Sequence, residues 1–125
     1  MAKKGMLQVR WRKEPEEQDY PAAESYLGLI YPAAKSGKLA SALRKARCVE
    51  FEAKDIFRAS ALAMLGVSNS HVRKDQKKIA AGRPISPLLL VRDRANGKVV
   101  IADGYHRLCA VYTLDEDATV PCKIV

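Results

Sequence analysis

A short run of apolar residues that gives way at once to a helical pattern constrains the fold of this chain most strongly. Residues 99–102 are apolar and mostly β-branched, which is typical of a buried strand. Asp103 and Gly104 end this run, and the apolar residues that follow recur at i, i+3, i+4 and i+7: Tyr105, Leu108, Cys109 and Tyr112. The stretch predicts a strand, a tight glycine turn, and a helix whose apolar stripe faces a sheet.

The first turn of this helix is suited to binding an anion. The first backbone amides of a helix have no intrahelical acceptor, and the aligned peptide dipoles make this end partly positive. Gly104 has no Cβ to hold a phosphate away from the backbone. Arg107 adds a planar fork for phosphate oxygens, and protonated His106 adds a second donor. The spacing equally allows a simpler interpretation, in which Asp103 is an N-cap and the basic residues are solvated.

The octapeptide DGYHRLCA at residues 103–110 resembles the signature box of the ParB/sulfiredoxin superfamily, in which a Gly-x-x-Arg core opens an alanine-rich helix. Residues 79–91 are similar to the helix end, glycine, proline and strand that precede this box, and residues 120–125 to the closing strand. The resemblance covers about residues 48–125. It implies an α/β (α+β) core domain with a small mixed β-sheet and packed helices. Residues 1–47 then form an N-terminal arm and helical extension.

A second set of basic residues lies on the helix expected over residues 71–81. His71, Lys74 and Lys78 follow the i, i+3, i+7 spacing and share one face. In nucleotide-binding members of the resembled superfamily the equivalent helix contributes polar and basic residues to the phosphates. The resemblance thus implies that this face joins Gly104, Tyr105, His106 and Arg107 in one anion site. The alternative is a surface helix with its lysines in solvent. Arg73 and Lys77 form a second basic row on the same helix. Basic residues on a polar helix therefore do not by themselves indicate a binding site.

Composition limits the partners without naming them. The net charge is +8 and the pI is near 9.6, a balance that attracts phosphate-bearing ligands. No long single-sign run stands out, so we expect a solvated basic surface. No apolar run approaches the roughly 18 residues of a membrane span, and no signal-peptide core follows the first residues, which predicts a cytoplasmic chain. The three cysteines sit in apolar patterns and are expected to be reduced, and no metal cluster is apparent.

The rest of the chain supplies the expected framework. Helices are predicted over residues 22–31 and 38–46, with Pro32 and Ser36-Gly37 as breaks, and a half-buried strand over residues 47–52. A buried strand is expected at residues 88–91, with Asn96-Gly97 as the hairpin turn that follows. Residues 6–11 suggest a short strand or an arm. Trp11 within it is expected to dock the tail onto the domain, and stacking on a base is the alternative.

Two activities of the resembled superfamily are not expected. Sulfiredoxin-type repair needs a nucleophilic cysteine at the position that Tyr105 occupies, and Cys109 lies a turn later on the stripe that faces the sheet. Chromosome-partition ParB proteins carry a DNA-reading helix-turn-helix domain after this one. Because the sequence ends at Val125, on the closing strand, we do not expect sequence-specific reading of DNA.

Three functions remain open. The first is a nucleotide- or phosphate-binding module, in which the Gly104 turn and Arg107 hold the phosphates of ATP or CTP, with Mg²⁺. The second is a small ATP-dependent kinase or phosphohydrolase, similar to superfamily members that phosphorylate free serine; Asp103, Glu50 and Glu52 match its acidic residues loosely. The third is a protein that binds DNA without sequence specificity. None of the three involves a membrane.

Overall fold

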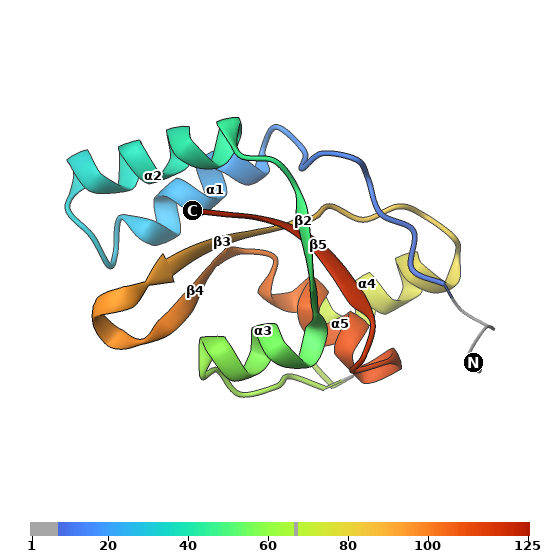
Figure 1. Ribbon diagram of the computed structural model, residues 1–125. Helices are drawn as coiled ribbons and strands as arrows, with labels where there is room; N and C mark the ends of the chain where they lie inside the picture. The colour runs from blue at the N-terminus through green and yellow to red at the C-terminus, as the bar shows by residue number, and fades with distance from the viewer. Residues whose placement is uncertain (1–7, 67) are drawn as a thin grey trace.

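The computed structural model describes residues 8–66 and 68–125. Within these ranges the chain forms a mixed α/β fold of five α-helices and a four-stranded sheet, and two of the helices precede the first strand of the sheet. The helices are α1 (Asp19–Leu27), α2 (Ala33–Lys45), α3 (Ala53–Ser60), α4 (Ser70–Ala80) and α5 (Tyr105–Leu114). The strands are β2 (Val49–Glu52), β3 (Leu88–Asp93), β4 (Lys98–Asp103) and β5 (Thr119–Ile124), and the 3₁₀ turn η1 (Arg94–Asn96) links β3 to β4 (Figure 1).

The sheet is mixed, as predicted. Its strand order is β2-β5-β3-β4, with antiparallel pairs at both sides and a parallel pair, β3 and β5, in the centre. The order in space differs from the order in sequence. The strand of residues 49–52 therefore lies at the opposite edge from β4, the strand that leads into the glycine turn.

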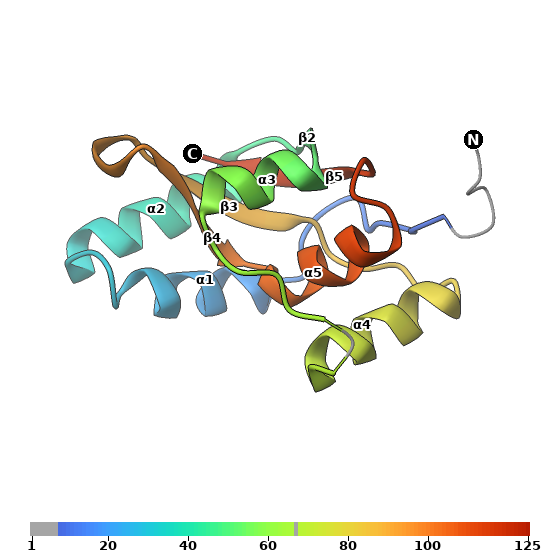
Figure 2. The ribbon, with the colours of Figure 1, turned by 90° about the horizontal axis from the view of Figure 1, so that it is seen from below.

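Helices cover both faces of the sheet. Figures 1 and 2 show α1 and α2 on one face and α3 and α5 on the other, with α4 packed outside α5. Strand β3 is buried on both sides: Leu88 and Leu90 belong to the core beneath α3 and α5, while Leu89 and Val91 belong to the core beneath α1. Burial on two faces explains why this strand is an unbroken apolar run rather than an alternating one.

The N-terminal helices supply the second hydrophobic core. Tyr20, Ala23 and Leu27 of α1 pack with Leu43 of α2 against buried residues of β3 and β4. The predicted break at Ser36-Gly37 is wrong, because both residues lie inside α2. The Ser36 hydroxyl donates to the Ala33 carbonyl at 3.1 Å. A glycine costs a helix only about 1 kcal/mol, which the packing of this helix offsets.

The edge strand β2 is shorter and more exposed than predicted. A half-buried strand was predicted over residues 47–52, but Val49 and Phe51 are 42% and 37% exposed. An edge strand has one neighbour only, and Phe51 lies at the rim of an apolar cavity of about 220 Å³ beside α3. Half-burial is therefore not reached here.

The N-terminal arm docks on the core through Trp11, as predicted. Trp11 pairs with Ile85 in an isolated parallel bridge, and Val9 and Trp11 pack against the cluster beneath α3 and α5. The part of the predicted strand at Met6 and Leu7 lies outside the described residues. The three cysteines are free, and two of them are buried.

Candidate functional site

A polar cavity of about 190 Å³ lies between α4 and the start of α5. Its walls are formed almost entirely by polar side chains and backbone from α4, from the end of β4 and from the first turn of α5. The lining residues are His71, Lys74, Asp75, Lys78, Asp103, Gly104, Tyr105, His106 and Arg107. The structure thus brings together every residue expected in the anion site. It adds one residue that the sequence analysis did not single out, Asp75.

The first turn of α5 lines this cavity, and its backbone amides have no hydrogen-bond partner among residues 8–66 and 68–125. Gly104 is the N-cap, and no side chain accepts a hydrogen bond there. The first helical bond runs from the Leu108 amide to the Gly104 carbonyl at 2.9 Å. The amides of Tyr105, His106 and Arg107 therefore precede the helical pairing and remain donors for a ligand.

The start of α4 differs, because its amides are already used. The Asn69 side chain accepts from the amides of His71 and Val72 at 2.9 Å and 3.2 Å. Asn69 is thus the N-cap of α4. Of the two helix ends that meet at the cavity, only that of α5 is open to an anion.

Gly104 is required for a reason other than the one expected. Its φ of 108° lies in a region that other residues rarely adopt. A Cβ on Gly104 would lie 2.7 Å from Cγ of Leu88 and 2.9 Å from Nη2 of Arg107. The missing side chain thus permits the close packing of the turn on β3 and on Arg107, rather than clearing a path for a phosphate.

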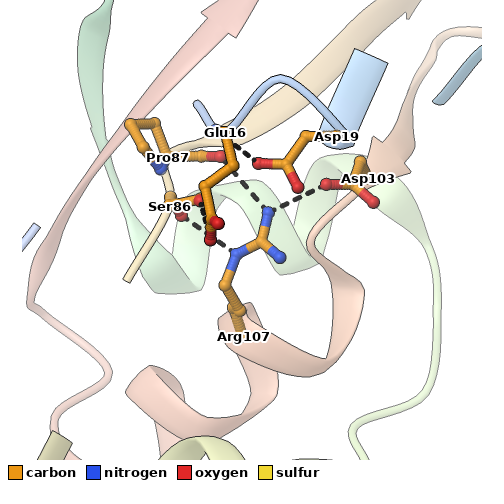
Figure 3. A network of polar contacts seen from close by, with 6 residues as sticks. All are labelled: Glu16, Asp19, Ser86, Pro87, Asp103 and Arg107. Atoms are coloured by element: carbon orange, nitrogen blue, oxygen red, sulfur yellow. Dashed lines mark hydrogen bonds and ion pairs between the residues drawn. The ribbon is translucent and has the colours of Figure 1, made fainter. Parts of the chain in front are cut away.

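The guanidinium of Arg107 points into the protein and holds three segments together (Figure 3). Its Nε donates to the Ser86 carbonyl at 2.9 Å, and its Nη2 donates to the Pro87 carbonyl at 3.3 Å and to Oδ2 of Asp103 at 3.0 Å. The side chain is only 17% exposed. Arg107 is therefore not a solvated residue, and Asp103 is its partner rather than an N-cap. The i, i+4 spacing of the pair is the sequence signal that indicates this contact.

Residues of the N-terminal arm and of the start of α1 extend this network through Ser86. Oδ2 of Asp19 accepts from the Glu16 amide at 3.0 Å, and the Ser86 hydroxyl donates to Glu16 at 3.3 Å (Figure 3). Burial raises the pKa of Asp103 above its ordinary value, and the nearby charge of Asp19 adds to this, while Arg107 lowers it. No sequence pattern links the arm to Arg107, because the contacts span most of the chain.

Two histidines lie side by side, each in the first turn of its helix. The ring centroids of His71 and His106 are 4.8 Å apart, with an angle of 41° between the rings. Burial lowers the pKa of His106, and the charges of His71 and Arg107 lower it further, against the opposing effect of Asp75. This lowering of the pKa favours the neutral form of His106.

Tyr105 forms one wall of the cavity and ties down the loop after α3. Its hydroxyl donates to the Ala63 carbonyl, and its ring lies 5.5 Å from that of His106. The Leu65 amide donates to the sulfur of Cys109 at 3.5 Å, which fixes the same loop to α5. Cys109 is fully buried, and burial raises the pKa of its thiol.

The acidic residues expected for catalysis do not meet. Glu50 is exposed on β2, and Glu52 lies 3.7 Å from the ammonium of Lys54, at the opposite edge of the sheet from Asp103. Asp103 itself is bound to Arg107. In the described part of the chain, no group of three or more His, Cys, Asp or Glu residues could hold a metal ion.

No protein-family model, curated protein or solved structure matches this sequence. Across residues 8–66 and 68–125, no helix has both the length and the apolar character needed to cross a membrane. The function is therefore inferred from the geometry of the cavity.

Proposed function

We propose that this chain is a nucleotide- or phosphate-binding module of the ParB/sulfiredoxin type. The observation that carries the proposal is the polar cavity, in which Lys74, Lys78 and His71 of α4 face the uncapped start of α5. The order of helix, Gly82, strand, glycine turn and helix around one mixed sheet supports the assignment of the fold type.

Each part of the cavity has a distinct role toward a phosphate. The amides of Tyr105, His106 and Arg107 donate to its oxygens, and the partial positive charge of the helix end favours the anion. Lys74 and Lys78 add point charges. Arg107 is a positioning residue, because its Nε and Nη2 hold the turn in place.

The cavity is small for a complete nucleotide. Sites for drug-sized molecules usually measure about 300–1,000 Å³, whereas this one measures about 190 Å³. A phosphate or the end of a polyphosphate fills it, and the remainder of ATP or CTP lies outside. Magnesium would be shared between phosphate oxygens and water, as is usual for nucleotide complexes.

A kinase or phosphohydrolase is the weaker candidate. The separation of Glu50 and Glu52 from Asp103 leaves the cavity without the acidic set that this activity calls for. We therefore expect stoichiometric binding without turnover. Incubation with ATP and Mg²⁺ should release no ADP or phosphate; sustained release from a pure preparation would favour the enzyme.

Calorimetry with inorganic phosphate, ATP and CTP, each with and without Mg²⁺, tests the binding. The double variant K74Q/K78Q should bind at least about tenfold more weakly, since a charged hydrogen bond contributes about 1.5–3 kcal/mol. The matched control R73Q/K77Q removes the same charge from the same helix outside the cavity, and its affinity should be unchanged. Equal affinities for both variants would overturn the proposal.

A further inference from the structure

A basic surface extends beyond the cavity along α4. Val72 and Ile79 bury one side of this helix, and the basic residues of both rows lie on the opposite side. Arg73, Lys74 and Lys77 are exposed, and Lys78 is half-buried. The sequence offers these residues only as a polar helix face.

The N-terminal arm continues this surface past the end of α4. Val9 and Trp11 turn toward the core, so the alternating side chains of Arg10 and Arg12 turn outward. The arm is held there by backbone bonds between Arg12 and Ile85 at 2.8 Å and between Ile85 and Arg10 at 2.9 Å. Nη1 of Arg10 donates to the Gly82 carbonyl at 3.0 Å, which places it beside Arg83. Figures 1 and 2 both show the arm near the C-terminal end of α4.

We call these residues together the basic ridge: Arg10, Arg12, Arg73, Lys74, Lys77, Lys78 and Arg83. Within the described residues, none of them takes part in an ion pair. Asp75 of α4 lines the cavity together with Lys74 and Lys78 and forms no ion pair with them, and Glu14 of the arm pairs with the buried Lys123 at 3.0 Å. The ridge is thus an uncompensated positive surface built from segments far apart in sequence.

We propose that the basic ridge binds the sugar-phosphate backbone of a nucleic acid without reading its sequence. Interfaces of this kind are polar and strongly positive, whereas protein interfaces have apolar or aromatic centres. A membrane surface fits less well, because membrane-binding faces carry large apolar side chains. The exposed large apolar residues found in the described chain lie elsewhere, none of them on the ridge.

Fluorescence anisotropy with a short labelled DNA duplex and a single-stranded RNA, measured against salt, tests this proposal. The triple variant R73Q/K77Q/R83Q should bind more weakly and should reduce the slope of log K against log salt on the duplex by about 2.7, or 0.9 per lost contact. The control K38Q/K45Q/R47Q removes equal charge from exposed positions in and just after α2 and should keep the wild-type slope. Whether duplex or RNA binds more tightly identifies the source of the phosphates.

The opposite results are equally clear. Equal losses of nucleic-acid affinity in the two triple variants would mean that only net charge matters, and would overturn the proposal. Tighter binding to vesicles of phosphatidylserine and phosphatidylcholine than to either nucleic acid would assign the surface to membranes instead. The triple variant leaves the cavity residues intact. The affinity of this variant for inorganic phosphate should therefore equal that of the wild type, so the phosphate site is tested independently of the ridge.

Discussion

Asp103 and Arg107 form an ion pair across the first turn of α5, with Oδ2 and Nη2 3.0 Å apart and both side chains less than one-fifth exposed. The pair ties the end of β4 to the helix, while the same guanidinium reaches the carbonyls of Ser86 and Pro87 before β3. These contacts therefore hold in place the turn whose backbone amides are proposed to bind phosphate.

Removing Arg107 should destabilise the fold. In R107A the largely buried carboxylate of Asp103 loses its partner, and we expect the free energy of unfolding to fall by about 3 kcal/mol. Urea denaturation of R107A, D103A and the double variant measures this. The double variant should lose clearly less than the sum of the single ones. Additive losses would show that the two side chains do not depend on each other.

The pH dependence of stability should reveal the raised pKa of Asp103. Its pKa is raised in the folded protein, so the folded state holds this proton more tightly than the unfolded state, and its contribution to stability falls as the pH rises through the acid range. In D103N this contribution is absent. The stability of the wild type relative to D103N should thus decline between low pH and neutrality, as followed by urea denaturation. A relative stability that rises instead would contradict the direction of the shift.

Substitution of Gly104 should cost more than that of another glycine with a positive φ. G104A places a Cβ 2.7 Å from Leu88 and adds backbone strain. G97A adds only the strain, since a Cβ on Gly97 meets no atom within 4 Å and its φ is 64°. We expect the loss of unfolding free energy to be about 1 kcal/mol in G97A and clearly larger in G104A. Equal melting temperatures for the two variants would show that the turn has room for a Cβ at position 104.

Binding of an anion in the cavity should favour protonation of His106. The pKa of His106 is lowered by burial and by the charge of His71, whereas a bound anion favours the charged imidazole. The affinity for sulfate, which keeps its charge in this range, should rise as the pH falls from 8 to about 5. H106Q should flatten this profile. A wild-type affinity that stays constant with pH would mean that His106 does not contact the anion.

Local patterns predicted much of the corner that carries the site. The apolar run, the Asp103-Gly104 break and the helical stripe correspond to β4, the turn and α5. The helix expected over residues 71–81 corresponds to α4, and the face with His71, Lys74 and Lys78 does line the cavity. Each of these features depends on residues close together in the chain, which is the range over which periodicity and caps are informative.

The features that were missed depend on long-range packing. Strand order placed Glu50 and Glu52 away from Asp103, although the sequence allowed them to meet. Arg107 faces carbonyls that lie about twenty residues earlier, so its structural role is invisible in the box itself. The basic ridge joins the arm to α4 through the bridge between Trp11 and Ile85, a pairing that no local pattern specifies.

The central claim, that the open start of α5 binds a phosphate, is tested most directly by nuclear magnetic resonance. A titration of the ¹⁵N-labelled protein with inorganic phosphate should shift the amide signals of Tyr105, His106 and Arg107 most strongly, with smaller changes at Lys74 and Lys78. The amides of Arg73 and Lys77, outside the cavity, should move little. Saturable shifts confined to the basic ridge, with the three amides of α5 unmoved, would contradict the account.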